Sequence, residues 1–305
     1  MYRFIAHRVV QAIGTIMVVS VVIFMFVHAS GDPAALLVPF DEANLDTIEE
    51  MRERLGLNRP LHVQYFTFMV GFWRSDNVKS FRYEEPVLTV VFRGLRWTLV
   101  LAGGAMAVGI LLAIPLGTYA ALNRGSYIDV LVRVVAVFGQ SMPSFWVAML
   151  LMLFISVKLQ ILPVSGLGFK NAILPIATLS FFQVALLLRL FRSEMLEVIH
   201  TDYIRTARAK GLKESVVVYR HAFKNAAMPV VTMVGLQLGG LIQGAVVVEP
   251  IFAWPGLGFV LVNSIFLRDF PVVIAGALIA AALVSLINLL VDTVYAFLDP
   301  RIRVS

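Results

Sequence analysis

The chain has 305 residues, of which 59% are hydrophobic and only 14% are charged. Soluble domains contain about 25% charged residues, so this composition excludes an ordinary soluble fold and indicates a membrane protein. The net charge of +6 does not indicate a nucleic-acid partner, because the basic residues lie between the apolar runs. The absence of cysteine excludes a disulfide framework, a thiolate metal site and a cysteine nucleophile.

Six apolar runs are long enough to cross a bilayer as helices, which requires about 20 residues each. They are Val9–Val27, Thr98–Leu122, Val134–Val157, Ala172–Leu188, Pro229–Val248 and Val272–Phe297. Residues such as Gly103, Pro115 and Pro143 do not argue against helix within these runs, because neighbouring helices can satisfy the freed backbone groups. The runs predict an all-α integral membrane protein with six transmembrane helices.

The first run raises the alternative of a cleaved signal peptide, because Arg3 and Arg8 precede it and the small residues Ala29 and Ser30 follow it. Its apolar stretch is longer than the roughly 7–15 residues of a signal-peptide core, which favours an uncleaved anchor. Two further apolar stretches, Leu61–Trp73 and Gly258–Leu267, are too short to span and are interpreted as interfacial or re-entrant helices.

The distribution of Lys and Arg predicts the orientation. With a cytoplasmic N-terminus, the inner segments hold 14 basic and seven acidic residues, whereas the outer segments hold 11 basic and 12 acidic ones. Both termini are therefore expected in the cytoplasm. The expected organisation is an N-terminal transmembrane helix at 1–29, a small extracytoplasmic domain at 30–97, a five-helix core at 98–299 and a cytoplasmic tail at 300–305.

The expected extracytoplasmic domain contains one clear helical pattern, at Asp41–Gly56, with Asp46 as a possible cap and Gly56 as a stop. The aromatic residues that follow Pro60 suit a helix at the level of the lipid headgroups. This region is either a small packed cap on the helices or a docking surface for an external partner.

The inner segment 189–224 is the longest basic connection. Thr201 or Asp202 can cap a short helix, and Gly211 offers a positive φ at which the chain turns into a second short helix. Three side chains there provide apolar anchors among Arg and Lys, namely Tyr203, Ile204 and Leu212. The pattern is compatible with a turn that faces the headgroups or with a rigid protrusion for a cytoplasmic partner.

Uncharged polar side chains lie deep in the predicted spans. They bond between helices or line a weakly polar path, and the path candidates are Gln140, Ser141, Gln183, Gln237 and Gln243. The central parts of the spans contain no ionisable residue, which disfavours a proton- or sodium-coupled secondary carrier. No phosphate-binding loop and no nucleophile–base pair is visible at depth, so we expect neither ATP hydrolysis nor enzymatic activity from this chain.

Several short motifs occur in a consistent order along the whole chain. They are Gly31-Asp32-Pro33, the run from Tyr203 to Leu212, Phe252-Ala253-Trp254-Pro255-Gly256-Leu257-Gly258 and Arg268-Asp269-Phe270-Pro271. Together they resemble the permease subunits of bacterial ABC importers, in the dipeptide, oligopeptide and nickel branch, and the first of its two permeases. The wider importer signature has Glu-Ala-Ala where this chain has Arg205-Thr206-Ala207, a substitution typical of the peptide branch, and the outer stretch 75–78 departs from that branch.

This resemblance implies a heteromeric pump in the bacterial inner membrane. Its other parts would be a second homologous permease, two ATPase subunits that bind ATP and Mg²⁺, and an extracytoplasmic substrate-binding protein, with lipid around the spans and no cofactor in this chain. The implied coupling helix comprises Tyr203, Ile204, Arg205, Thr206, Ala207, Arg208, Ala209, Lys210, Gly211 and Leu212. The outer loop 249–271 would contact the binding protein through Phe252, Trp254, Pro255 and Gly256. Short peptides are the expected substrates, with nickel complexes, glutathione or opines as alternatives.

Overall fold

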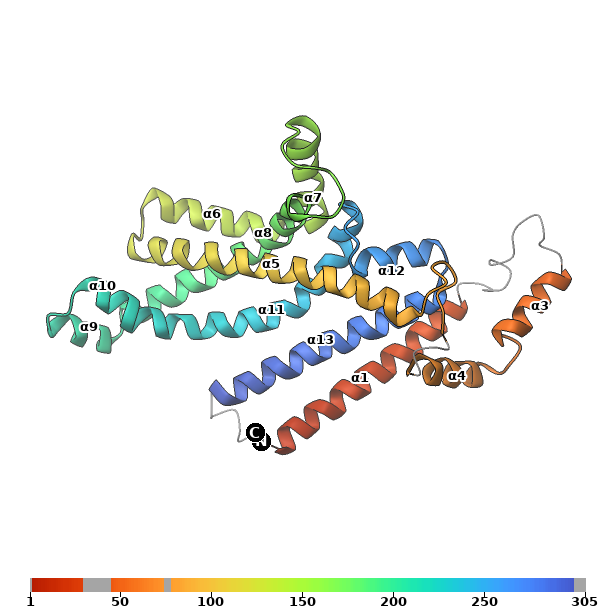
Figure 1. Cartoon of the computed structure of the whole chain (residues 1–305). Helices are drawn as coiled ribbons and strands as arrows, with labels where there is room; N and C mark the ends of the chain where they lie inside the picture. The colour runs from red at the N-terminus through yellow and green to blue at the C-terminus, as the bar shows by residue number, and fades with distance from the viewer. Residues whose placement is uncertain (1, 30–44, 74–77, 299–305) are drawn as a thin grey trace. The chain divides into compact units, whose positions relative to one another are not determined.

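The computed structural model describes residues 2–29, 45–73 and 78–298 (Figure 1). These residues form helices and no strand, with one isolated bridge between Lys79 and Pro86. The helices are α1 (Tyr2–Ala29), α3 (Leu45–Leu55), α4 (Leu61–Trp73), α5 (Val87–Leu122), α6 (Tyr127–Ser141), α7 (Ser144–Leu151), α8 (Phe169–Ile199), α9 (Asp202–Ala209), α10 (Glu214–Val216), α11 (Phe223–Ile251), α12 (Leu257–Phe266) and α13 (Phe270–Leu298). Two π-helical stretches continue α7 and α10, at Met152–Lys158 and Val217–Ala222.

Five helical stretches of the described residues are long and apolar enough to cross a membrane. They are Ala6–Phe26, Val87–Leu122, Phe169–Ile199, Glu214–Ile251 and Phe270–Thr293. A sixth span is formed if the bent pair Tyr127–Ser141 and Ser144–Lys158 crosses as one unit. The sequence-based prediction of six spans agrees with this count when the pair is taken together.

The expectation of one continuous helix over Val134–Val157 is wrong, because the two halves meet at an angle of 108°. Met142 adopts an extended backbone with φ −86° and ψ 126°, and Pro143 follows it. Proline disfavours the helical conformation of the residue before it and provides no N–H for the helix. Pro115 and Pro175 lie inside continuous helices, so proline alone does not predict the break.

Other boundaries also differ from the sequence patterns. Helix α5 begins at Val87, directly after Pro86 and well before the expected Thr98. After Gly211 the chain becomes helical again at α10, but this helix is not a separate short one, because the helical stretch runs from Glu214 through the π-helical turn and α11 to Ile251. In α3, Asp46 lies within the first turn rather than at the cap, and Gly56 ends the turn with φ +70° as expected; residues 41–44 of the predicted helix lie outside the described residues.

The chain divides into two compact units, the first comprising residues 1–98 and 255–296 and the second residues 99–254. In the first unit α1 and α13 run side by side in opposite directions (Figure 1). Phe24 of α1 packs with Ile274 and Leu278 of α13, and Arg8 pairs with Asp292 at 3.1 Å. A second apolar cluster joins α4, the start of α5, α12 and α13 around Val91, Leu257 and Val272.

The start of α12 lies directly against α5 within the first unit. A Cβ at Gly94 would lie 3.1 Å from the backbone of Leu257, closer than most Cβ contacts, so this approach favours glycine. The Thr98 hydroxyl accepts a hydrogen bond from the Leu257 N–H at 2.8 Å and satisfies one of the unpaired amide groups at the start of the helix. Thr98, which the sequence analysis gives as the first residue of an apolar run, thus lies within α5 and contacts α12.

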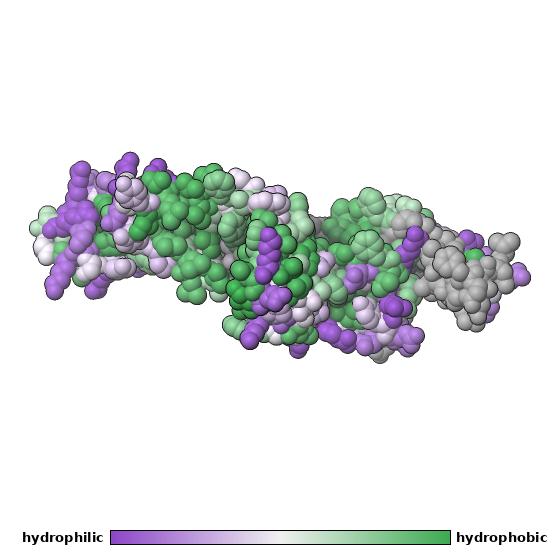
Figure 2. Space-filling model, turned by 90° about the horizontal axis from the view of Figure 1, so that it is seen from above, coloured by the Kyte–Doolittle hydropathy of each residue, from purple (hydrophilic) through white to green (hydrophobic). Residues whose placement is uncertain are grey.

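In the second unit, α8 packs against α6 and α11. A Cβ at Gly139 of α6 would lie 2.5 Å from the Cβ of Ala185, so small residues allow these two helices to approach closely. Much of the outer surface of α6 is apolar, including exposed Leu131, Val137 and Phe138. Figure 2 shows apolar residues over much of this unit and hydrophilic residues gathered at the end that carries α9 and α10. An apolar outer surface with hydrophilic residues gathered at one end is typical of helices that face lipid or a partner subunit in the membrane.

Candidate functional site

The segment after α8 forms a compact turn around the short helix α9. Thr201 occupies the N-cap position, but its hydroxyl donates to the Val198 carbonyl at 2.6 Å instead of capping the helix. At the other end Gly211 adopts φ +77°, a conformation that favours glycine. Both ends therefore lie where the sequence pattern predicted them.

Helix α9 presents two different faces. Ile204 and Ala207, three residues apart, are buried and fix the helix to the rest of its unit. Tyr203, Arg205, Thr206 and Leu212 remain exposed. Of the three predicted apolar anchors, Ile204 is buried in this structure, whereas Tyr203 and Leu212 are exposed.

Polar contacts hold α9 against the chain that follows it. The guanidinium of Arg208 donates two hydrogen bonds to the carboxylate of Glu214, at 2.6 and 3.1 Å, and this contact raises the pKa of Arg208 above its ordinary value. The side-chain amide of Asn225 donates to the Tyr203 hydroxyl at 2.7 Å. The exposed face is thus displayed on a segment that is tied at both sides, which suits a rigid contact surface.

A buried ion pair lies near the base of this segment. Asp129, near the start of α6, is 1% exposed and accepts a hydrogen bond from Arg192 of α8 at 2.5 Å. Asp129 also accepts from the Gly125 N–H, while the Ser126 hydroxyl accepts from the Asp129 N–H and caps the start of α6. This pair fixes the start of α6 to the part of α8 that leads into α9.

A cavity of about 220 Å³ lies in the second unit beside the break between α6 and α7. It is lined by residues of α7, α8 and α11 together with Met142, among them Gln183, Gly240 and Gly244. Gln183 is 3% exposed, and its side-chain oxygen is buried without a hydrogen-bond partner among the described residues. An unpaired buried acceptor is costly, so its position beside a cavity marks Gln183 as a candidate for contact with a transported molecule.

The other path candidates lie elsewhere. Gln140 donates to the carbonyl groups of Ala136 and Ala185, at 3.1 and 3.5 Å, which is a contact between helices. Ser141 is exposed and donates to its own helix. Gln237 is half-buried and Gln243 is exposed, and neither lines this cavity. Of the five path candidates, only Gln183 lines this cavity. Gly240 and Gly244 of α11 also line it, and the sequence analysis did not predict them.

The segment 249–271, predicted as an outer loop, is largely helical. Glu249 to Ile251 belong to α11, and residues 257–266 form α12. Phe252, Trp254 and Gly256 are buried and Pro255 is half-buried, whereas Phe266 and Leu267 are exposed. The predicted contact residues thus shape the turn, and the exposed apolar surface of this loop lies at the end of α12.

A buried carboxylate fastens the turn after residue 78 to this loop within the first unit. Asp269 accepts a hydrogen bond from the Ser80 hydroxyl and two more from the N–H groups of Phe81 and Arg82, both at 3.2 Å. Both Asp269 and Ser80 are buried. The sequence offered Asp269 only as part of a family motif, and nothing in it indicated Ser80 as the partner.

We expect Asp269→Ala to lower the free energy of unfolding by about 3 kcal/mol, because it leaves buried donors without an acceptor. Glu85→Ala is the matched control, since Glu85 pairs with Arg93 at 2.6 Å on the surface and such pairs contribute about 1 kcal/mol or less. Denaturant titration of the purified protein in detergent measures both changes. Equal losses in the two variants would contradict the structural role of Asp269.

These features define a polytopic, all-helical membrane protein that carries a short exposed helix on a fixed turn and an internal cavity among its spans, the architecture of a transport permease. Residues 113–304 match the family described as binding-protein-dependent transport system inner membrane component, and residues 1–102 match the N-terminal domain of such membrane components. The chain belongs to this family and is a permease subunit of an ABC importer of the inner membrane.

Two named relatives cover nearly the whole chain. The glutathione transport system permease protein GsiC of Salmonella typhimurium (strain LT2) is 40% identical over 305 residues, which is 99% of both chains. A putative peptide transport system permease protein of Brucella abortus (strain 2308) is 41% identical over 313 residues, again 99% of both chains. These similarities confirm the family resemblance that the motifs indicated.

Proposed function

We propose that this permease forms half of the membrane path of an importer for short peptides, with glutathione, itself a short peptide, among the candidate substrates. The observation that carries this proposal is the end-to-end similarity to permeases named for peptide and glutathione transport. Nickel complexes and opines remain the alternatives that the family resemblance raises. A second homologous permease would complete the path.

The cavity beside Gln183 supports a position for the path within the second unit. Its lining is largely apolar, and the unpaired amide oxygen of Gln183 is suited to accept a hydrogen bond from a peptide N–H. An uncharged surface of this kind would bind a peptide only weakly, and weak binding allows the substrate to leave the path. Gln140, Ser141, Gln237 and Gln243 stay in the proposed path as residues outside this cavity.

The exposed face of α9 is the proposed contact with the ATPase subunits. Those subunits would bind ATP and Mg²⁺ and hydrolyse the nucleotide, and this chain would transmit their movement without catalysing a reaction. The fixed ends of α9 and the Arg208–Glu214 pair support this role, because a rigid helix transmits displacement better than a mobile loop.

The proposed topology has both termini in the cytoplasm and residues 30–97 as a small extracytoplasmic domain. The inner segments are the basic ones, which supports this orientation. On the outer side the loop 249–271 would contact the substrate-binding protein. Phe252, Trp254, Pro255 and Gly256 would shape that loop, and the exposed Phe266 and Leu267 would supply apolar contact area.

Uptake of a labelled dipeptide and of labelled glutathione, by cells that contain the complete importer or lack this chain, tests the proposal. We expect uptake of at least one of the two to require this chain and ATP. Loss of nickel uptake with unchanged uptake of both peptides would overturn the peptide assignment. Uptake by the purified chain alone would overturn its role as a subunit.

Gln183→Leu separates a transport role from a structural one. We expect uptake to decrease about fivefold, the equivalent of one hydrogen bond of about 1 kcal/mol. Stability should stay unchanged or increase, because the substitution removes a buried acceptor that has no partner. Gln11→Leu, on the exposed surface of α1, is the control and should leave uptake unchanged. A parallel loss of stability and uptake in Gln183→Leu would contradict the path assignment.

A further inference from the structure

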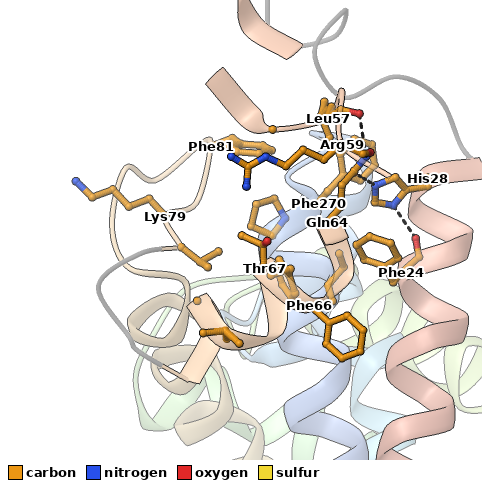
Figure 3. Close-up of a pocket in the computed structure, with 17 residues that line it drawn as sticks. Phe24, His28, Leu57, Arg59, Gln64, Phe66, Thr67, Lys79, Phe81 and Phe270 are labelled. Atoms are coloured by element: carbon orange, nitrogen blue, oxygen red, sulfur yellow. Dashed lines mark hydrogen bonds between the residues drawn. The ribbon is translucent and has the colours of Figure 1, made fainter. Parts of the chain in front are cut away.

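A second cavity, of about 660 Å³, lies within the first unit (Figure 3). Its walls come from the end of α1, the turn at residues 56–59, helix α4 and the start of α13. Most of the lining is apolar and aromatic, including Phe24, Phe66, Phe68, Phe81 and Phe270. A cavity of this size and character is in the range of about 300–1,000 Å³ that holds small organic ligands.

The cavity lies at the ends of two candidate membrane spans. The apolar stretch of α1 ends at Phe26 and that of α13 begins at Phe270, and the lining residues Phe24 and Ile274 belong to these stretches. His28 follows the first stretch directly, and Arg59 lies in the turn before α4. Helix α4, with 13 residues, is too short to span and exposes Phe66 and Val70, as an interfacial helix does.

A hydrogen-bond network forms one wall of the cavity and holds the ring of His28. The side-chain nitrogen of Gln64 donates to the carbonyl groups of Leu57 and Arg59, at 2.8 and 2.7 Å, so its side-chain oxygen is the acceptor that faces His28. The ring of His28 contacts that oxygen through Nε2 and the Phe24 carbonyl through Nδ1, both at 2.9 Å. The contact between His28 and Gln64 joins the end of α1 to α4 beside the cavity.

The charged lining residues are basic. Arg59 and Lys79 line the cavity, and no acidic residue among those the structure describes does. Neither side chain makes an ion pair within the described part of the chain. Within the described residues, the cavity therefore combines an apolar interior with the basic side chains of Arg59 and Lys79 and no acidic one.

We propose that this cavity binds one phospholipid with an anionic headgroup. Its acyl chain would lie against the aromatic residues, and its phosphate would pair with the guanidinium of Arg59. Lys79, whose side chain extends away from the cavity (Figure 3), would add positive charge at its rim. A peptide suits the site less well, because its ammonium group would meet Arg59 and Lys79 and no carboxylate among the described lining residues. The lipid would join α1, α4 and α13 at the level of the headgroups, and this role does not depend on the transported substrate.

Native mass spectrometry of the complete importer, reconstituted with either phosphatidylglycerol or phosphatidylcholine, tests the proposal. We expect the wild-type complex to retain phosphatidylglycerol at least fivefold more than phosphatidylcholine after detergent washing. The double variant Arg59→Gln with Lys79→Gln should lose this preference. The matched double variant Arg82→Gln with Lys170→Gln removes two exposed charges outside the cavity lining and should keep it.

Thr67→Trp provides a second test that leaves every charge in place. Thr67 lines the cavity, so the indole ring would occupy space needed by an acyl chain, and retained phosphatidylglycerol should fall about fivefold. Equal retention of the two lipids by the wild type would overturn the proposal, as would equal retention by the wild type and both cavity variants. Displacement of the lipid by a labelled dipeptide would assign the cavity to substrate instead and would also overturn it.

Discussion

Tyr203→Ala is expected to reduce uptake about thirtyfold if α9 contacts an ATPase subunit as proposed. Tyr203 is 43% exposed beside the buried Ile204, so its ring is available to a partner. Truncation of an aromatic residue at the centre of an interface costs about 2 kcal/mol or more, which corresponds to this loss of affinity. Recovery of the ATPase subunits with the tagged permease and peptide uptake should decrease together.

Two control variants separate docking from folding. Tyr203→Phe keeps the ring and loses only the hydrogen bond from Asn225, so it should retain most of the uptake. Tyr127→Ala removes the same side chain from a position that is 96% exposed at the start of α6 and outside the proposed contact, and it should have no effect. Full uptake by Tyr203→Ala, or an equal loss in Tyr127→Ala, would contradict the coupling role of this face.

The positions of the spans could be predicted from the sequence because the bilayer determines how many apolar residues a helix needs. Their ends could not, because a helix can continue beyond its uninterrupted apolar run. At the start of α5, Arg93 and Arg96 interrupt that run, although Val87 and Val91 are buried and belong to the same helix.

The buried face of α9 could be predicted only in part from the sequence. Ile204 and Ala207 are three residues apart, the spacing of one helical face, and this pattern indicates burial. Their positions beside Tyr203 and Arg208 favoured interpretation as one mixed docking surface. Which apolar residue faces the chain's own core depends on the packing of α9 against the helical stretch after Gly211, and a local pattern does not contain that information.

Contacts between residues far apart in the sequence could not be predicted from local patterns either. Asp129 and Arg192 are 63 residues apart, and Ser80 and Asp269 are 189 apart. Each pair needs the fold to bring it together. The unpaired oxygen of Gln183 is a similar case, because the sequence shows an amide within a span and cannot show that its acceptor lacks a donor.

The Asp129–Arg192 pair leads to the largest expected loss of stability. Asp129→Asn should lower the free energy of unfolding by about 3–5 kcal/mol, because it leaves the guanidinium of Arg192, which is 16% exposed, without its charge partner. Denaturant titration in detergent measures this loss. Uptake should decrease with it, since α8 leads directly into α9.

The neighbouring Arg133 provides the control within the same cluster. Its guanidinium lies 3.6 Å from Asp129 but is 56% exposed, so Arg133→Met should cost about 1 kcal/mol or less. A cost for Asp129→Asn no larger than this would show that burial does not make the pair important.

The double variant Asp129→Leu with Arg192→Met tests whether the charges themselves are needed. Removal of both charges leaves no unpaired ion, so apolar packing should restore much of the stability that Asp129→Asn loses. If uptake also returns, the pair only holds α6 to α8. If stability returns and uptake does not, the charged contact has a further role in transmitting movement between α9 and α8. Failure of the double variant to recover stability would contradict the assignment of the cost to an unpaired buried charge.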